Sequence, residues 1–347
     1  MKLTNRQQQI IALISNQKRL SISQILKLLN NDISQVTLNR DLAKLVKNRF
    51  LTKTGKSRAI RYAVSNFYQL FAPINLDTYF TKEPDQRNAA QNFNHELYDL
   101  LTDIDIFSME EKKLLKSIKA AHQKNISDIS PILYKKEMER LTIELSWKSA
   151  QIEGNTYSLL ETEKLFLKRE SAKNKSKEET QMLLNHKDAL NYLLQNKNLT
   201  ENLNLRVIEE IHSLLIKDLG VSKNIRSRGV GITGTAYKPL DNEFQIKEYL
   251  VKMCDLINSR ENGFEKALLA IVLISHIQPF EDGNKRTGRM VGNALLISND
   301  ACPLSYRSVD SIDYKKAILL FYEQNNMSAF KQLFIEQNEF SVKNYFQ

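Results

Sequence analysis

Residues 278–289 read QPFEDGNKRTGR, a stretch in which acids, cations and a glycine turn lie together. The periodicity of the flanking residues predicts a helix on each side of Gly283. The second helix would begin with free main-chain N–H groups and would carry Arg286 and Arg289 on one face. This combination predicts a polyphosphate site, with Asp282 beside it as a candidate ligand for a magnesium ion that bridges phosphate oxygens.

The same stretch contains the glycine spacing of a P-loop, because four residues separate Gly283 from Gly288. A P-loop also needs Lys and then Ser or Thr after its second glycine, and it follows a strand. Arg289 and Met290 occupy those two positions, and the preceding residues have helical periodicity. A P-loop is therefore excluded.

Outward from this stretch, from about Lys112 to the C-terminus, apolar residues recur at helical spacing with few interruptions. Residues 226–240 depart from that pattern, because three glycines alternate with apolar and aromatic side chains before Pro239. Such alternation is typical of a two-stranded hairpin. The expected fold class is mainly α, with a β-hairpin flap on an all-helical domain.

The first 65 residues differ from the rest of the chain in charge. They hold thirteen of the 50 Lys and Arg residues and two of the 40 acids, which gives +11, whereas the remainder carries −1. Such a positive field binds phosphate backbones without reading sequence. The same segment has the periodicity of three short helices, followed by basic, strand-like sequence around Gly55. These features predict a winged helix with double-stranded DNA as its partner.

Residues 32–51 resemble the recognition helix of winged helix-turn-helix repressors, with a Ser/Thr-rich start, then Arg-Asp-Leu, then an apolar pair before the wing. The start of such a helix reaches base edges in the major groove, and basic wing residues hold phosphates. The candidates for base contacts are Ser34, Gln35, Thr37, Asn39 and Arg40, and those for phosphate contacts are Lys53, Lys56 and Arg58. A protein-docking module is the alternative.

Composition excludes several other classes. No apolar run reaches the length of a membrane span and the N-terminus lacks a signal-peptide pattern, so we expect a cytoplasmic protein without a membrane partner. Cys254 and Cys302 have no partner at metal-ligand spacing, which argues against a disulfide framework or a zinc site. A homo-oligomer is left open.

Three segments resemble motifs of the Fic (Fido) family. Residues 278–289 match its signature, His-Pro-Phe-x-Asp/Glu-Gly-Asn-Gly/Lys-Arg-x-x-Arg, from Pro279 onward. Residues 149–154, SAQIEG, resemble its inhibitory motif, Ser/Thr-x-x-x-Glu-Gly/Asn, and residues 229–239, GVGITGTAYKP, are similar to the flap that docks target segments. The resemblance extends from about residue 70 to the C-terminus.

The resemblance implies a helical domain that binds ATP and Mg²⁺ and transfers AMP to a hydroxyl side chain of a target protein. The residues that would bind the ligands are Asp282 for the metal, Gly283, Asn284 and Lys285 for the phosphate cradle, Arg286 for the inner phosphates and Arg289 for the γ-phosphate. The inhibitory residues would be Ser149, Glu153, which would pair with Arg289, and Gly154. The docking residues of the flap would be Gly231, Ile232, Thr233, Gly234, Thr235 and Tyr237.

One position departs from the family pattern, because the histidine that serves as general base is replaced by Gln278. A carboxamide has no basic site near pH 7, so the usual contribution of roughly 10²- to 10⁴-fold is expected to be missing. His276 lies about 200° away around a helix, so it would point nearly opposite Gln278 unless the helix ends there.

Three hypotheses follow. The chain is an active transferase that uses another base or none, or a silent nucleotide binder that changes how the winged helix meets DNA, or an enzyme in which Glu153 activates water to remove AMP from a modified protein. We favour the second, a transcriptional regulator with weakened or absent AMP transfer. A purely structural role is the remaining alternative and predicts no affinity for ATP.

The expected organisation has three parts. Residues 1–65 form the winged helix-turn-helix domain, residues 66–130 form a helical connector packed on the Fic core, and residues 131–347 form the Fic domain. Within the Fic domain, the inhibitory helix is expected at about 140–155 and the flap at about 226–240.

Overall fold

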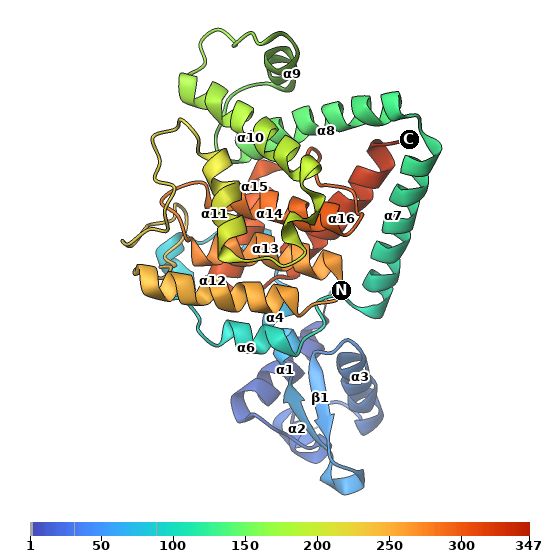
Figure 1. Cartoon of the computed structure of the whole chain (residues 1–347). Coiled ribbons are helices and arrows are strands. Elements are labelled where there is room, and N and C mark those ends of the chain that lie inside the picture. Colours follow the sequence, from blue (N-terminus) through green and yellow to red (C-terminus); the bar gives the residue numbers. More distant parts are fainter. Residues whose placement is uncertain (1–2, 31, 88) are drawn as a thin grey trace. The chain divides into compact units, whose positions relative to one another are not determined.

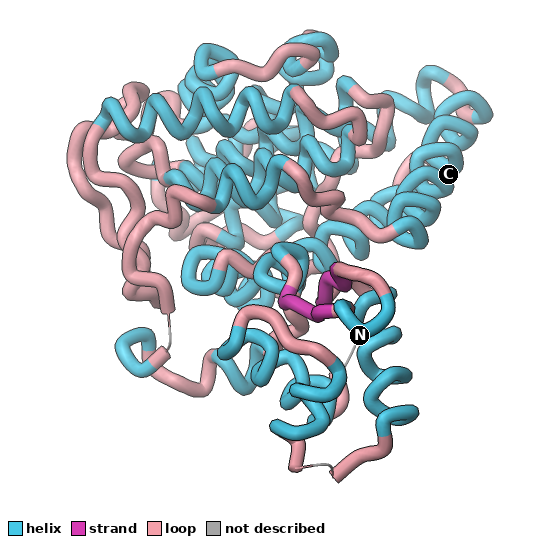
Figure 2. Tube along the Cα trace, turned by 90° about the horizontal axis from the view of Figure 1, so that it is seen from below, coloured by secondary structure: helices cyan, strands magenta, loops and turns pink. Residues whose placement is uncertain are grey.

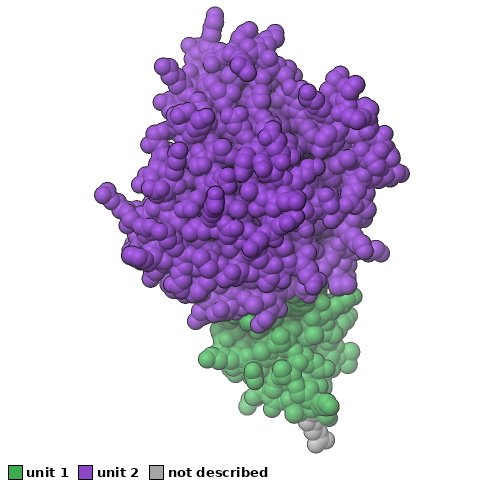
Figure 3. Space-filling view, in the orientation of Figure 1, with its two compact units in different colours: residues 1–82, 324–329 green, residues 83–323, 330–347 purple. Residues whose placement is uncertain are grey.

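The structure is a computed structural model that describes residues 3–30, 32–87 and 89–347. The chain divides into two compact units, which Figure 3 colours separately. The first comprises residues up to 82 together with 324–329, and the second comprises residues 83–323 and 330–347. Residues 66–130 are thus divided between the two units.

The first unit consists of three helices, a two-stranded wing and two further short helices, so the predicted helix–helix–helix–wing order is confirmed. Its elements are α1 (Asn5–Gln17), α2 (Ile22–Leu28), α3 (Gln35–Lys47), β1 (Leu51–Thr54), η1 (Ser57–Ala59), β2 (Arg61–Val64), α4 (Asn66–Phe71) and α5 (Leu76–Tyr79). Among the residues described, β1 and β2 are the only strands, and they pair antiparallel (Figure 2).

Local sequence explains where these helices begin. The side-chain oxygens of Thr4, Ser21 and Ser34 accept main-chain N–H groups at the starts of α1, α2 and α3. Inside the unit, Arg6 Nε donates to the buried Asp41 carboxylate at 2.5 Å and thereby ties α1 to α3. Val36, expected among the apolar residues of α3, is 78% exposed, because it lies about 200° around the helix from the buried Leu38.

Residues 324–329 complete the first unit from the far end of the sequence. Met327 N–H donates to the carbonyl of Leu70 at 2.7 Å, and Asn326 Nδ2 donates to the carbonyl of Ala72 at 2.8 Å. These contacts fix the segment beside α4, although 254 positions of chain separate Ala72 from Asn326.

The second unit is helical (Figure 1). Its elements are η2 (Pro84–Gln86), α6 (Leu97–Thr102), α7 (Met109–Asp128), α8 (Pro131–Ile152), α9 (Leu159–Lys168), α10 (Lys177–Gln195), η3 (Lys197–Thr200), α11 (Leu205–Leu215), α12 (Glu243–Asn258), α13 (Gly263–Ile277), α14 (Asn284–Ser298), α15 (Ser311–Gln324) and α16 (Ser328–Asn344). None of the helices in the described part combines the length and apolar character that a membrane span requires.

Helices α13 and α14 form the centre of this unit. α13 is buried along its length from Ala267 onward, so it is apolar on all sides. The two helices approach closely because α14 presents Gly288 and Gly292 to α13. A Cβ at Gly292 would lie 2.5 Å from Ile271 Cγ1, and one at Gly288 would lie 2.9 Å from the carbonyl oxygen of Ile271. This close pair sets the position of the turn between the helices.

The flap prediction is wrong in one respect, because residues 226–240 form no hairpin. They contain no strand, and Lys238 instead makes an isolated parallel bridge with Asn92. The ends of the segment are held from outside, since Arg226 N–H donates to the carbonyl of Pro279 at 3.0 Å and Lys238 N–H donates to that of Gln91 at 2.8 Å. With these partners elsewhere in the chain, the two arms of the flap do not pair with each other.

Candidate functional site

The turn between α13 and α14 is built around one glycine and one asparagine. Gly283 has φ +81°, and a Cβ there would lie 3.2 Å from Ile216 Cγ2 and 3.4 Å from His212 Cε1. Asn284 closes the loop, since its Oδ1 accepts the Phe280 N–H and its Nδ2 donates to the Phe280 carbonyl, both at 2.8 Å. Phe280 in turn stacks on His212 with ring centroids 3.6 Å apart. These contacts fix the conformation of the turn that precedes α14.

Two buried arginines follow this turn and have unused hydrogen-bonding capacity. Arg286 Nη2 donates to Asp282 Oδ2 at 2.6 Å, but its Nε and Nη1 have no partner within the described residues. The same holds for Nη1 of Arg289. Buried N–H groups without an acceptor are costly. An oxyanion at the N-terminus of α14 would satisfy them, so the residues fit a phosphate chain.

The segment that resembles the inhibitory motif meets this site at Arg289. Arg289 Nη2 donates to Glu153 Oε1 at 2.9 Å, and Lys285 Nζ lies 3.0 Å from Glu153 Oε2. Burial opposes ionisation of Glu153, but the charges of Arg289 and Lys285 outweigh it and lower the pKa of Glu153 to about 2. The carboxylate is thus ionised at neutral pH and occupies cations that a phosphate would need.

Ser149 extends this contact into the interior. Arg289 Nε donates to Ser149 Oγ at 3.0 Å, and Arg289 Nη2 donates to the Ser149 carbonyl at 2.9 Å. Ser149 Oγ lies 2.9 Å from His186 Nε2, while His186 Nδ1 lies 2.7 Å from the Met182 carbonyl. Since a carbonyl only accepts, Nδ1 carries the proton, and Nε2 accepts from Ser149. Because the Ser149 hydroxyl donates to His186, its oxygen is left to accept from Arg289 Nε. This chain of hydrogen bonds fixes the orientation of the Arg289 guanidinium.

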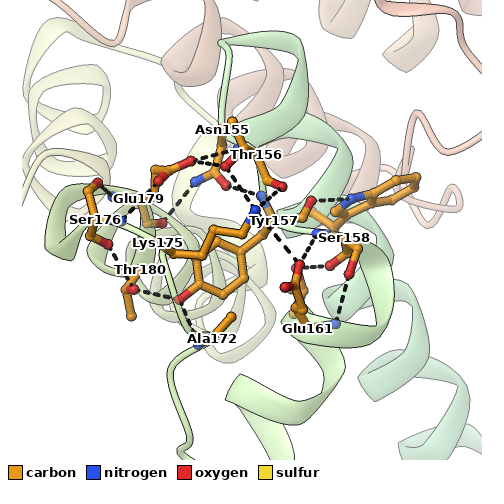
Figure 4. A network of polar contacts seen from close by, with 12 residues as sticks. Asn155, Thr156, Tyr157, Ser158, Glu161, Ala172, Lys175, Ser176, Glu179 and Thr180 are labelled. Carbon is orange, nitrogen blue, oxygen red and sulfur yellow. Dashed lines mark hydrogen bonds and ion pairs between the residues drawn. The ribbon is translucent and has the colours of Figure 1, made fainter.

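The chain after Gly154 is anchored by the polar network of Figure 4. Glu179 Oε1 accepts from the N–H and the hydroxyl of Thr156, both at 2.7 Å, and Asn155 Nδ2 donates to the Glu179 carbonyl at 2.8 Å. The hydroxyls of Tyr157 and Thr180 lie 2.6 Å apart. These bonds join the chain that follows α8 to the start of α10, so the segment next to Glu153 is held in place.

Gln278 lies at the end of α13 with its carboxamide bound on both sides. Its Nε2 donates to the Ser275 carbonyl at 2.6 Å and to Tyr322 Oη at 3.3 Å, and its Oε1 accepts from Asn284 Nδ2 at 2.9 Å. Its backbone is left-handed, with φ 52°, and its N–H donates to the Ile274 carbonyl. The residue is 8% exposed. This position therefore offers an orienting amide and no proton acceptor of useful basicity.

His276 is a core residue. Its ring packs among Phe93, Tyr237, Phe321 and Tyr322, and neither ring nitrogen has a hydrogen-bond partner within the described residues. Burial lowers the pKa of His276 to about 3. The helix ends at Ile277, so the angle predicted for two residues within a helix does not apply here. The imidazole is nevertheless fully buried and too weakly basic to take the place of the missing histidine.

Asp282 remains a candidate ligand for Mg²⁺. Its side chain is 64% exposed beside the Arg286 guanidinium. No group of three or more His, Cys, Asp or Glu side chains gathers into a metal cluster in the part of the chain that the structure describes. Magnesium usually keeps several waters and takes one or two carboxylates with phosphate oxygens. One carboxylate therefore fits a magnesium ion held mainly by phosphate and water.

The flap residues differ in role. Gly231, Thr233 and Gly234 are exposed, Ile232 and Thr235 are half-buried, and Tyr237 is buried. The Tyr237 hydroxyl donates to the His276 carbonyl at 3.0 Å and its ring stacks on the His276 imidazole. The resemblance makes Tyr237 a docking residue for a target, but its burial makes it an anchor of the flap. Arg87 Nη2 adds a second anchor by donating to the Gly234 carbonyl at 2.6 Å.

Comparison with known proteins identifies a domain within each unit. Residues 202–296 match the Fic/DOC family, and residues 6–55 match the DeoR-like helix-turn-helix domain. The chain carries a Fic/DOC domain. It is 28% identical over 188 residues to the protein adenylyltransferase Fic of Aedes aegypti, a match that covers 50% of this chain and 35% of that protein. The chain thus spans about a third of the length of this curated relative.

Solved structures share the fold of the Fic/DOC domain. Fic-1 from C. elegans has a TM-score of 0.58 and 20% identity, with 68% of this chain and 72% of that chain covered. A Fic domain containing signaling protein from Bacteroides thetaiotaomicron VPI-5482 has the same TM-score and identity, with 66% of this chain and 94% of that chain covered. At identities this low, the likeness shows the fold alone.

In the DeoR-like domain, the predicted DNA-binding residues lie mostly on the surface. Gln35, Asn39 and Arg40 are exposed on α3, Thr37 is half-buried, and Ser34 uses its hydroxyl to cap the helix. Lys53 and Lys56 are exposed on the wing, whereas the side chain of Arg58 lies outside the described residues. The exposed Val36 adds an apolar group at the start of α3, of the kind that contacts a thymine methyl.

Sequence reasoning missed four residues of the Fic/DOC site. His186, Arg226, Tyr314 and Tyr322 are buried around the motif, and Arg226 Nε donates to the Gln278 carbonyl at 2.6 Å. The Arg289 guanidinium lies over the Tyr314 ring at 5.2 Å. One signal was available, since His186 lies on the apolar face of a predicted helix, where a polar group needs a partner. The other three carry no local mark of their role.

Acid is expected to destabilise the second unit well above the pH at which carboxylates protonate. Burial lowers the pKa of His122 and His212 to about 4 and that of His186 and His276 to about 3. The unfolded chain takes up these protons near pH 6.5, so stability falls as pH drops from there. The loss is up to about 1.4 kcal/mol per pH unit for each histidine.

Thermal unfolding between about pH 7 and about pH 5 measures this effect. Replacing His276 with Phe is expected to flatten the dependence, because it removes one buried imidazole whose nitrogens have no hydrogen-bond partner among the described residues. An unfolding temperature that is constant over this range would contradict the prediction.

Proposed function

We propose that the protein is a nucleotide-responsive DNA-binding regulator that acts in the cytoplasm. In this proposal the Fic/DOC site binds ATP with Mg²⁺ and the helix-turn-helix domain binds double-stranded DNA. AMP transfer to a protein hydroxyl is weak or absent.

One observation supports nucleotide binding above the others: N–H groups of Arg286 and Arg289 beside the N-terminus of α14 have no acceptor within the described residues. Two guanidinium groups and free helix N–H groups bind phosphates through charge-assisted hydrogen bonds. Arg286 and the turn at Gly283 would hold the inner phosphates. Arg289 would hold the terminal phosphate once Glu153 withdraws, and Asp282 would hold Mg²⁺.

The residues around the site limit which reactions a bound nucleotide would undergo. Magnesium, when bound, would neutralise charge on the phosphates. Gln278 orients the loop but accepts no proton from an attacking hydroxyl. Removal of AMP by water gains no support, because Glu153 is paired with Arg289 and Lys285 and its pKa of about 2 makes it a weak base. Nucleotide binding without efficient transfer is the function that these groups favour.

Calorimetry of the full chain with ATP and Mg²⁺ tests the proposal. Wild-type protein is expected to bind. Arg286→Ala is expected to bind about 10- to 100-fold more weakly, since a hydrogen bond to a charged group is worth about 1.5–3 kcal/mol. Arg206→Ala removes an exposed guanidinium from α11 and serves as the matched control, with unchanged affinity. Absence of binding heat from folded wild-type protein would refute the phosphate site.

DNA binding is expected to be strongly salt-dependent. Removing both exposed wing lysines, Lys53→Ala and Lys56→Ala, is expected to weaken binding to all duplexes alike. The slope of log K against log salt should fall by about 1.8, or about 0.9 for each lost phosphate contact. Fluorescence anisotropy with a labelled duplex over a salt series measures this. Affinity that barely changes between low and moderate salt would favour a protein-docking module instead.

A further inference from the structure

We propose that α15 transmits the state of the Fic/DOC site to the DNA-binding unit. The inference rests on the proposed function, because it concerns the route by which nucleotide occupancy would reach DNA. It starts from a feature of the chain: α15 begins within the second unit, and its last residue, Gln324, already belongs to the first.

The body of α15 contacts both residues that distinguish the site. The ring of Tyr314 faces the Arg289 guanidinium at 5.2 Å, and Tyr322 Oη accepts from Gln278 Nε2 at 3.3 Å. Both tyrosines are buried. If phosphate replaced Glu153 as the partner of Arg289, the guanidinium would shift against the Tyr314 ring. Close-packed rings respond to such a shift by moving together, because the interior has little free volume.

The end of α15 also contacts the flap. Tyr322 stacks on Tyr237 with centroids 5.5 Å apart. Glu323 forms a buried ion pair with Arg87 at 3.1 Å, and the same Arg87 donates to the Gly234 carbonyl of the flap. Helix α15 therefore contacts Arg289 and Gln278. It also contacts the two anchors of the flap, Tyr237 and Arg87.

Beyond Glu323 the chain enters the first unit and is bonded there at three successive points. Gln324 Nε2 donates to Tyr79 Oη at 3.2 Å, Asn326 Nδ2 donates to the Ala72 carbonyl, and Met327 N–H donates to the Leu70 carbonyl. Because Gln324 is the last residue of the continuous helix α15, a displacement of this helix would act directly on these bonds.

Within the first unit, contacts continue from α4 to the end of the recognition helix. Phe67 of α4 stacks on Phe50 at 6.3 Å, and the Arg49 guanidinium lies 4.1 Å from the Phe67 ring centroid. Ser65 Oγ donates to the Arg49 carbonyl, and Phe50 N–H donates to the Leu45 carbonyl of α3 at 2.9 Å. The route thus begins at side chains packed against Arg289 and Gln278 and ends at residues bonded to the recognition helix α3.

Hydrogen exchange of the full chain, with and without ATP and Mg²⁺, tests this route. Three segments report separately: residues 283–290 on the site, residues 324–329 on the end of α15, and residues 35–47 on the recognition helix. The Met327 amide is a direct probe, because its proton makes the bond to Leu70. In wild-type protein the ligand is expected to protect residues 283–290 and to change exchange of the other two segments by at least about fivefold.

The decoupling variant combines Asn326→Ala with Gln324→Ala, since these two changes remove the side-chain bonds to Ala72 and Tyr79. It is expected to retain protection of residues 283–290 while the change at residues 35–47 falls below about twofold. Asn338→Ala is the matched control, because its buried amide also donates to a main-chain carbonyl, that of Phe334, and it is expected to behave as wild type. If the combined variant fails to fold, Gln324→Ala alone, which removes the bond to Tyr79, replaces it.

The outcomes separate the two proposals. No protection at residues 283–290 in wild-type protein would refute nucleotide binding itself. Protection there without any change at residues 324–329 and 35–47 would overturn the role of α15 and leave nucleotide binding intact. A change at residues 35–47 that persists in the decoupling variant would also overturn it, because the signal would then pass by another route.

Discussion

Gln278→His is expected to raise the rate of AMP transfer by about 10²- to 10⁴-fold, the usual contribution of a positioned general base. The backbone of Gln278 is left-handed, with φ 52°, and histidine is among the residues that tolerate this conformation. An imidazole there would replace an amide that now bonds to Ser275 and Asn284. It would accept the proton that Gln278 has no basic site to accept.

The measurement is incorporation of label from α-labelled ATP into protein, made in a Glu153→Gln background so that the inhibitory carboxylate does not mask the gain. Gln278→Leu is the control, because it removes the amide without supplying a base. Adding Asp282→Ala to the Gln278→His variant is expected to abolish the label. If the Glu153→Gln protein with its native Gln278 incorporates label as fast as the Gln278→His variant, another group already supplies the base.

Glu153→Gln is expected to tighten ATP binding by about 10- to 100-fold. The carboxylate now holds Arg289 at 2.9 Å and Lys285 at 3.0 Å, and a terminal phosphate would have to displace it. Charged hydrogen bonds of this kind are worth about 1.5–3 kcal/mol each, and an amide keeps the shape of the side chain without its charge. The free variant should also be less stable, since Arg289 would be left as a buried charge without its counter-ion.

Calorimetry with ATP and Mg²⁺ measures the affinity, and thermal unfolding measures the cost to the free protein. Glu139→Gln is the matched control, since it removes an exposed carboxylate from the same helix, α8, and should change neither quantity. Affinity that stays the same or weakens in Glu153→Gln would mean that Glu153 does not compete with the nucleotide.

Local signals in the sequence predicted much of the fold. The periodicity of apolar residues placed the three helices of the first unit, and the structure adds that Thr4, Ser21 and Ser34 cap them. The turn at Gly283 was also predictable, because a glycine between two helical patterns is a local turn signal, and Gly283 has the left-handed φ of +81° that glycine adopts readily. The flap was predicted wrongly for the opposite reason: its partners, among them Gln91 and Pro279, lie far away in sequence, and alternation cannot show them.

By itself, the sequence determined that the chain has a basic helix-turn-helix module, a helical body and a phosphate-type turn in which glutamine replaces histidine. Capping, periodicity, charge and motif spacing are properties of residues close together in the chain, so they can be read without coordinates. Only the tertiary structure decided that Gln278 is bound by Tyr322, that His186 orients Ser149, and that α15 ends within the first unit. These contacts join residues that are far apart in the sequence, and only the packing of the core brings them together.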